Sequence, residues 1–379
     1  MKNNPIKKLL GINESIWLDN LSRNLIDSGE LERLIFQDGV TGVTSNPTIF
    51  QKAISGSKDY DESLGGFLAE GMRDEKELFL GLAIEDVSRA AQLFWPVYLR
   101  SGGLDGYISI EVSPDLANNT EKTVAEAKRL FSAIGRKNIL VKVPGTKEGL
   151  PAIEELTGEG VNVNVTLLFS ISRYEEVAEA YTRGLEKRVR QGKPVDEVVS
   201  VASFFVSRVD TMVDKLLESR LASAASEEES GKIKSLLGKA AVANAKLAYK
   251  KYKEFFGSRR FQSLPKARVQ RILWGSTGTK NPQYSDVKYV DELIGRDSVN
   301  TLPDATLKAY IDHGQTQVTI NKGVREAEGI FSQLAELGID IGKVTGDLEK
   351  EGVKLFSDSF FALLKEIAHK RDAFLAEKA

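Results

Sequence analysis

The sequence contains 379 residues, of which 41% are hydrophobic and 28% are charged, a balance typical of a folded globular protein. Its 52 basic and 54 acidic side chains give a net charge of −2, so there is no basic excess for binding nucleic acid or an anionic membrane. The absence of cysteine and the presence of only two histidines exclude disulfides, thiolate nucleophiles, Cys-ligated metals and His-rich metal sites. Any catalysis must therefore rely on lysine, carboxylates and hydroxyls, and we expect no metal.

The N-terminal segment contains lysines but no apolar stretch long enough for a secretory signal. No other segment approaches the roughly 20 apolar residues of a membrane-spanning helix. These features predict a cytoplasmic protein that acts neither on membranes nor on nucleic acid.

Short β-branched runs alternate with helical segments along the chain. The runs are 15–19, 40–44, 107–111, 138–143, 161–166, 198–203, 269–275 and, with the weakest pattern, 298–302. Most are followed by segments with helical periodicity, such as 123–134 and 172–190. Eight alternations predict a parallel sheet closed into a (β/α)8 TIM barrel, and we expect residues 1–379 to form a single domain.

Three regions exceed a minimal barrel. Residues near 55–105 predict two or more helices between the second and third strands, and residues near 209–262 predict two amphipathic helices after the sixth. The tail, 321–379, also reads as helix. Amphipathic helices of this kind usually cover a core, so we expect these regions to serve packing or an interface.

The fifth run, VNVNVT, has a clear period of two. Asn162, Asn164 and Thr166 share one face, and the three valines share the other. Taken alone, this pattern suits an edge strand with a wet polar face. Inside a barrel, the valines would instead face the outer helices and the polar groups would face the lumen, and the neighbouring runs favour this interpretation.

Polar residues stand at the carboxyl ends of six successive runs, where the catalytic groups of TIM barrels are found. They are Asp19, then Thr44 with Ser45 and Asn46, Glu111, Lys142, Asn164 with Thr166, and Ser203. Each could be an ordinary solvated turn residue. Polar residues at the ends of six successive predicted strands, however, predict a catalytic face at this end of the barrel.

Lys142 is the most informative of these residues, since it lies between Val141 and Val143 in a buried run. The alternation of a strand places it on the inward face with Leu140. Burial favours the neutral amine, which is the nucleophile needed for a Schiff base with a carbonyl substrate. The alternative is a lysine that extends along the strand until its ammonium reaches water.

The other groups required by such chemistry are also present. Asp19 and Glu111 could act as acid and base from two sides of the lumen, although helix capping or ion pairing would also explain them. Arg208 follows the sixth run and Lys280 the seventh. Because phosphate sites of barrels often lie beyond strands seven and eight, Lys280 is a candidate phosphate ligand, with Arg208 as a second.

Three ordered motifs resemble those of the transaldolases. They are residues 42–50 (GVTSNPTIF), 139–156 (ILVKVPGTKEGLPAIEEL) and 164–170 (NVTLLFS). The match extends from about residue 15 to 284, and the segment 273–286 (LWGSTGTKNPQYSD) resembles the longer bacterial branch of the family. The resemblance implies a cofactor-independent TIM-barrel enzyme of the non-oxidative pentose phosphate pathway. It would transfer dihydroxyacetone from sedoheptulose 7-phosphate to glyceraldehyde 3-phosphate, giving erythrose 4-phosphate and fructose 6-phosphate.

The resemblance also implies roles for individual residues. Lys142 would form the Schiff base, Asp19 would deprotonate the C4 hydroxyl, and Glu111 with Thr166 would hold a catalytic water. The remaining residues would contact substrate: Asn46 and Asn164 its hydroxyls, Thr44, Ser203 and Phe205 the walls of the pocket, and Arg208 and Lys280 its phosphate.

One position departs from the family pattern. Many members have Arg-Asn where this sequence has Lys280-Asn281, and the glycine-rich approach is one residue longer here. Lysine binds phosphate as a point charge and not bidentately. Ser276, Thr277 or Thr279 would therefore add hydroxyl contacts.

Two other functions are compatible with the barrel. A fructose 6-phosphate aldolase would share Lys142, but the resemblance implies glutamine in place of Glu111 in such enzymes. A non-catalytic sugar-phosphate-binding barrel would require the Lys–Asp–Glu set to be accidental. Sugar phosphates are the expected partners in every case. The resemblance to the transaldolases also suggests a homodimer.

Overall fold

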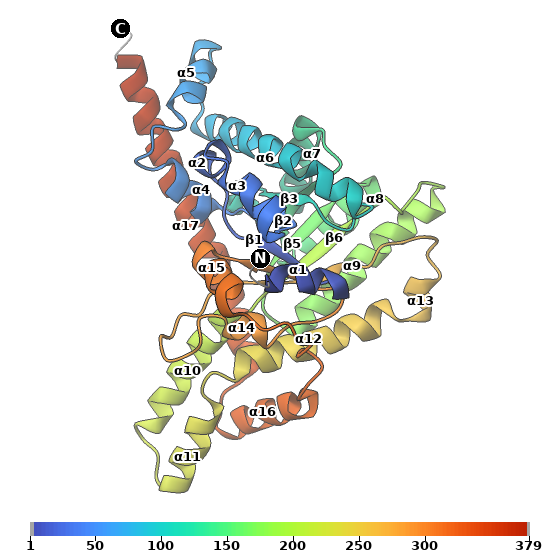
Figure 1. Ribbon diagram of the computed structural model, residues 1–379, viewed down its shortest axis with the longest axis vertical. Helices are drawn as coiled ribbons and strands as arrows, with labels where there is room; N and C mark the ends of the chain where they lie inside the picture. Colours follow the sequence, from blue (N-terminus) through green and yellow to red (C-terminus); the bar gives the residue numbers. More distant parts are fainter. Residues whose placement is uncertain (1–3, 377–379) are drawn as a thin grey trace.

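The structure, a computed structural model, describes residues 4–376 and contains a closed barrel of eight parallel strands (Figure 1). Each strand pairs with its neighbours in chain order, and β8 closes the barrel against β1. The strands are β1 (Ser15–Leu18), β2 (Gly42–Val43), β3 (Tyr107–Glu111), β4 (Ile139–Pro144), β5 (Val163–Leu168), β6 (Ser200–Phe205), β7 (Arg271–Gly275) and β8 (Val299–Leu302). The predicted (β/α)8 fold is confirmed.

The fifth predicted strand lies inside the barrel sheet, as the neighbouring strands indicated. Val163 and Val165 belong to the apolar layer between sheet and helices, while Asn164 bonds to side chains of β3 and β6. The edge-strand alternative is wrong because β5 pairs on both sides. Both β5 and β6 begin two residues later than predicted.

Helices cover the outside of the barrel. The first half of the chain contributes α1 (Pro5–Leu9), η1 (Leu10–Ile12), α2 (Arg23–Asp27), α3 (Glu30–Arg33), η2 (Leu34–Asp38), α4 (Pro47–Ile54), α5 (Asp61–Ala69), α6 (Glu75–Arg100), η3 (Pro114–Leu116), α7 (Thr120–Ile134), α8 (Gly149–Glu159) and α9 (Ile171–Arg190). The second half contributes α10 (Ser207–Leu221), α11 (Glu227–Leu236), α12 (Ala240–Phe256), α13 (Arg259–Gln262), α14 (Lys288–Asp291), α15 (Asp304–His313), α16 (Val324–Glu336) and α17 (Ile341–Ala376). No helix within residues 4–376 has the combined length and apolarity needed to cross a membrane.

The extra helices occur where they were expected, with one difference. Residues 55–105 contain α5 and α6, and the tail contains α16 and α17. The region near 209–262 was expected to hold two helices, but it contains α11, α12 and α13 together with most of α10. The region therefore holds four helices where two were expected, and the first of them, α10, begins two residues after the end of β6.

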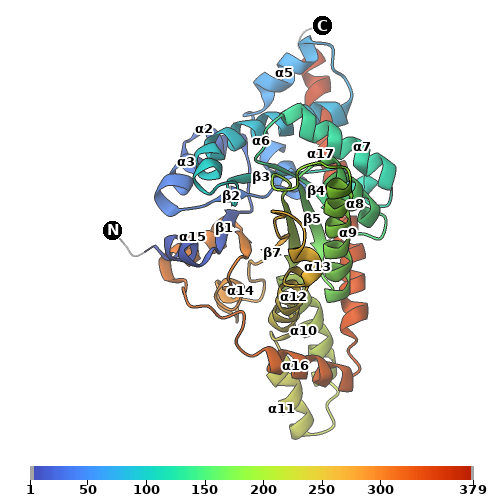
Figure 2. The ribbon, with the colours of Figure 1, turned by 90° about the vertical axis from the view of Figure 1, so that its right-hand side faces the viewer.

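Helix α17 is the longest element, with 36 residues, and runs along most of the length of the molecule (Figures 1 and 2). It packs against α4 and α6 at one end and α10 at the other, and it also contacts β5. Its buried side chains include Leu348, Phe356, Phe360 and Leu363. The C-terminal helix therefore crosses the barrel and joins elements from both halves of the chain.

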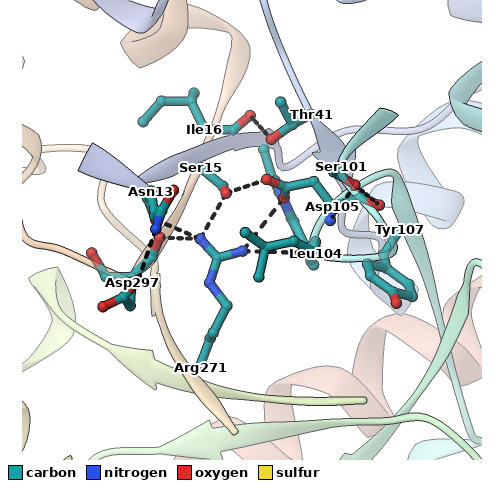
Figure 3. A network of polar contacts seen from close by, with 12 residues as sticks. Asn13, Ser15, Ile16, Thr41, Ser101, Leu104, Asp105, Tyr107, Arg271 and Asp297 are labelled. Carbon is teal, nitrogen blue, oxygen red and sulfur yellow. Dashed lines mark hydrogen bonds and ion pairs between the residues drawn. The ribbon is translucent and has the colours of Figure 1, made fainter. Parts of the chain in front are cut away.

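A buried polar network closes the amino-terminal end of the barrel (Figure 3). The guanidinium of Arg271 donates to Ser15 Oγ at 2.7 Å and to the Ser298 carbonyl at 2.7 Å, and lies 3.6 Å from Asp105. Asp105 also accepts hydrogen bonds from Ser15 Oγ and from Trp17 Nε1. This end is therefore sealed by paired charges above a layer of apolar lumen residues that includes Trp17.

Candidate active site

The opposite end of the barrel contains a cavity of about 290 Å³. Eight of the predicted site residues line it: Asp19, Thr44, Asn46, Lys142, Ser203, Phe205, Arg208 and Lys280. The other three, Glu111, Asn164 and Thr166, are buried and are not among its lining residues. Glu111 contacts Lys142 and Asn164 contacts Ser203, so these two support groups in the wall of the cavity.

Lys142 extends inward from β4 and is only 4% exposed. Register places it opposite Glu111 on β3, and the two side chains form an ion pair with Nζ 3.1 Å from Oε2. Nζ also donates to the backbone carbonyl of Ser45 at 2.9 Å. A buried ammonium is costly without such partners, and here two acceptors hold it at the cavity wall.

Glu111 is buried with one oxygen committed to Lys142. Its Oε1 has no hydrogen-bond partner within residues 4–376, and neither has the buried Thr166 Oγ1. Burial raises the pKa of Glu111, and the neighbouring Lys142 opposes this rise. Unpartnered buried oxygens of this kind are groups that an ordered water satisfies.

Asp19 lies directly after β1, where it accepts a hydrogen bond from Thr44 Oγ1 at 2.7 Å. Thr44 in turn lies 2.7 Å from Thr301 Oγ1 at the end of β8. Burial raises the pKa of Asp19, while Lys142 and the Thr44 hydrogen bond lower it. The side chain is thus a fixed carboxyl group whose affinity for protons exceeds that of an ordinary aspartate.

The predicted amide ligands have different surroundings. Asn164 donates to Ser109 Oγ at 3.0 Å and accepts from Ser203 Oγ at 2.7 Å, so β3, β5 and β6 are linked across the lumen. Asn46 caps α4, since its Oδ1 accepts from the Ile49 amide at 3.0 Å. This cap leaves the Nδ2 group of Asn46 available at the cavity.

Cationic groups gather at the outer part of the cavity. Arg208, at the start of α10, is half-buried, and no carboxylate within the described residues forms an ion pair with it. Its guanidinium lies 5.8 Å from the centre of the Phe205 ring, and burial lowers its pKa. Lys280 lines the same cavity and is exposed. An unpaired, partly buried guanidinium beside a second cation suits an anion such as phosphate.

Of the three hydroxyls expected to assist Lys280, only Ser276 lines the cavity. Thr277 donates to the carbonyl of Thr301 at 3.0 Å, and Thr279 donates to the carbonyl of Ser285 at 2.8 Å. Both threonines therefore shape the loop after β7 and do not face the cavity.

The cavity also contains residues that the sequence analysis did not select, among them Thr48, Lys52, Thr301 and Phe356. Thr301 could have been found, since it lies at the carboxyl end of the eighth predicted strand. Lys52 belongs to α4, which the cap at Asn46 places beside the cavity. Phe356 comes from α17 and has no local signal, because only the path of that helix brings it to the site.

Comparison with known proteins gives one consistent result. The family described as Transaldolase/Fructose-6-phosphate aldolase matches residues 16–367. A transaldolase from Trichodesmium erythraeum is 43% identical over 374 residues, which cover 98% of each chain. Transaldolase 2 from Nostoc sp. is 45% identical over 96% of this chain and 98% of its own.

A transaldolase from Thiobacillus denitrificans is 48% identical over 366 residues, covering 96% of this chain and 99% of its own. Each of these matches covers at least 96% of this chain and at least 98% of the relative. The chain therefore belongs to the transaldolase/fructose-6-phosphate aldolase family, and within it to the transaldolases, which are transferases.

Proposed function

We propose that this transaldolase moves a dihydroxyacetone unit from sedoheptulose 7-phosphate to glyceraldehyde 3-phosphate through a Schiff base on Lys142. The products are erythrose 4-phosphate and fructose 6-phosphate, as in the non-oxidative pentose phosphate pathway. The observation that supports this proposal is the position of Lys142, buried at the wall of the cavity between Glu111 and the Ser45 carbonyl. The reaction needs no cofactor, because the protonated imine itself accepts the electron pair.

In the first half-reaction, the neutral amine of Lys142 adds to the ketose carbonyl to give a carbinolamine. Loss of water from the carbinolamine leaves a protonated imine. Glu111 and Thr166, with their unpartnered buried oxygens, hold the water that carries protons in these steps. Burial raises the pKa of Glu111, which favours uptake and return of a proton by this carboxyl group in these steps.

Cleavage of the C3–C4 bond requires removal of the proton from the C4 hydroxyl. Asp19 takes this proton, the bond electrons move into the imine, and the aldose phosphate leaves while an enamine remains on Lys142. Thr44 holds the Asp19 carboxylate in place during this step. Asn46 and Ser203 line the cavity and bind hydroxyls of the three-carbon unit, while Asn164 lies behind Ser203 and positions it by accepting its hydroxyl hydrogen bond.

The phosphate of donor and acceptor occupies the cationic part of the cavity. Arg208 and Lys280 bind it, Ser276 adds a hydroxyl, and Phe205 forms the wall beside Arg208. Because this part lies apart from the pair of Lys142 and Glu111, phosphate binding orients the chain of the sugar along the cavity. We expect the enzyme to act in the cytoplasm as a homodimer of single-domain chains.

The proposal is tested by replacing the nucleophile. Lys142→Met should abolish formation of fructose 6-phosphate from sedoheptulose 7-phosphate and glyceraldehyde 3-phosphate in a coupled assay. Lys147→Met is the matched control, since Lys147 lies five residues further along and is exposed. Its activity should equal that of the unmodified enzyme. Retained activity in the Lys142 variant, or equal loss in both, would contradict the proposal.

A further inference from the structure

Helix α17 places the aromatic ring of Phe356 over the ammonium group of Lys142. The centre of the ring lies 5.9 Å from Nζ, and the side chain is 4% exposed. Phe356 and Lys142 line the same cavity. The ring is therefore part of the surface that any group bound to Nζ would meet.

Contacts on both sides of Phe356 fix α17 against the barrel. Gly352, one turn earlier, packs so closely on β5 that an added Cβ would lie 2.9 Å from Leu167 Cδ2. Ser359 Oγ lies 2.8 Å from Thr48 Oγ1 on α4. Phe360 meets the edge of Phe79, with ring centres 5.8 Å apart. These spacings place the four residues on one helix face, so Phe356 is held in position and does not swing freely.

The chemistry of this position follows from the proposed function, on which the inference rests. After cleavage, the enamine on Lys142 has two possible fates. It can add to an acceptor aldehyde, or it can take up a proton to give the imine of dihydroxyacetone. Water then adds to the imine carbon, and the carbinolamine breaks down to free dihydroxyacetone and the Lys142 amine. The second route consumes one water for each enamine and ends the transfer.

Phenylalanine can neither donate nor accept the protons that this second route requires. Its ring also occupies space from which water could approach the imine carbon. We propose that Phe356 determines the specificity of the reaction: it covers the Lys142-bound intermediate against water, so that the three-carbon unit passes to an aldehyde acceptor and is not released. The C-terminal helix thereby contributes to the choice between transfer and simple aldol cleavage.

The test compares two products of the same intermediate. Fructose 6-phosphate and erythrose 4-phosphate are supplied, and free dihydroxyacetone is measured against sedoheptulose 7-phosphate. Phe356→Ala should raise the ratio of dihydroxyacetone to transfer product by about tenfold, because water gains access to the imine. The ratio is independent of the fraction of enzyme that is folded, since every active molecule passes through the same intermediate.

Two further variants separate water exclusion from other effects. Phe356→Leu keeps an apolar cover without an aromatic face and should leave the ratio close to that of the unmodified enzyme. An increase as large as that in Phe356→Ala would overturn the proposal in favour of a ring–cation contact. Phe361→Ala changes an aromatic residue five positions further along the same helix, which is 50% exposed, and should not alter the ratio.

Failure of this inference is distinguishable from failure of the proposed function. If borohydride traps no adduct on Lys142 in the unmodified enzyme, the Schiff-base mechanism itself is wrong. If the adduct forms but Phe356→Ala leaves the ratio of products unchanged, the mechanism stands and the role of Phe356 is wrong. If Phe361→Ala raised the ratio of dihydroxyacetone to transfer product as much as Phe356→Ala does, any disturbance of α17 would have the same effect. That result would also overturn the proposal.

Discussion

Glu111 is buried and Asp19 half-buried near Lys142, and their partners differ in a way that separates their roles. Glu111 is in direct contact with the ammonium at 3.1 Å, whereas Asp19 is held by the hydroxyl of Thr44 at 2.7 Å. Burial raises the pKa of both. The carboxyl in contact with Lys142 can assist imine formation, and the one held by Thr44 remains available for the hydroxyl of the substrate.

This division of roles predicts the behaviour of Asp19→Asn. The imine with fructose 6-phosphate should still form, since Lys142 and Glu111 are unchanged, but the C3–C4 bond should not break. Borohydride reduction followed by mass spectrometry should therefore reveal a six-carbon phosphorylated adduct, where the unmodified enzyme gives a three-carbon adduct. A three-carbon adduct in the variant at the normal rate would contradict the role of Asp19.

The hydrogen bond from Thr44 also predicts a change in pH dependence. Asp19 must be ionised to accept a proton, so kcat/KM falls as the pH falls through its pKa, which burial has raised. Thr44→Val removes a donor to the carboxylate, which disfavours the ionised form and raises the pKa further. The acidic limb of kcat/KM should therefore move to higher pH.

Thr48→Val is the control for this pH profile. Thr48 also lines the cavity, but its hydroxyl pairs with Ser359 and not with Asp19. The acidic limb of the kcat/KM profile of Thr48→Val should lie at the same pH as that of the unmodified enzyme. A limb that moves in the Thr48 variant, or stays fixed in the Thr44 variant, would contradict the role assigned to the Thr44 hydrogen bond.

Among the elements, α10 and the loop after β7 are tied together beside the phosphate-binding part of the cavity. Arg208 stands at the start of α10, and Lys280 lies on the loop. Four residues after Lys280, the hydroxyl of Tyr284 donates to Asp214 on α10 at 2.8 Å. Asp214 is fixed in turn by the Gly238 amide, also at 2.8 Å. This hydrogen bond between Tyr284 and Asp214, here called the tether, sets the distance between Arg208 and Lys280.

Loss of the tether should weaken phosphate binding selectively. Tyr284→Phe removes a hydrogen bond worth about 1 kcal/mol, so we expect KM for glyceraldehyde 3-phosphate to rise about fivefold while kcat is unchanged. Glyceraldehyde without phosphate provides the internal comparison, and its KM should stay the same. Equal changes for both acceptors would mean that the loop does not act through the phosphate.

In the molecule as a whole, the two ends of the barrel use buried charge differently. At the carboxyl ends of the strands, Lys142 and Glu111 border a cavity. At the amino ends, Arg271 and Asp105 are buried in a network of hydrogen bonds (Figure 3). In TIM barrels, the first end carries the chemistry and the second contributes stability.

Asp105→Asn should therefore affect folding and not catalysis. Removal of the carboxylate leaves the Arg271 guanidinium buried without its counter-charge, and the free energy of unfolding in urea should fall by about 3 kcal/mol. KM and kcat should be unchanged. Glu77→Gln, in a half-exposed pair with Arg129, is the control and should cost less than about 1 kcal/mol. Unchanged stability, or a large change in KM, would contradict this division.

The barrel and the centre of its site could be predicted because they depend on local patterns. Each strand has its own β-branched run, and parallel strands bring their carboxyl ends together, so Asp19, Glu111 and Lys142 could be assigned to one face. The positions of Phe356 and Arg271 could not be predicted. The position of Phe356 depends on the path of a helix about three hundred residues later in the chain than α4, and that of Arg271 depends on a pairing with Asp105 in a distant loop.

The most direct test of the account is borohydride trapping with fructose 6-phosphate, followed by digestion and peptide mass spectrometry. We predict a dihydroxyacetone-derived adduct on the peptide that contains Lys142, and its loss when erythrose 4-phosphate is added before reduction. The discharge by an acceptor separates transfer from aldol cleavage. An adduct on another lysine, or no adduct in folded protein that binds sugar phosphate, would contradict the account.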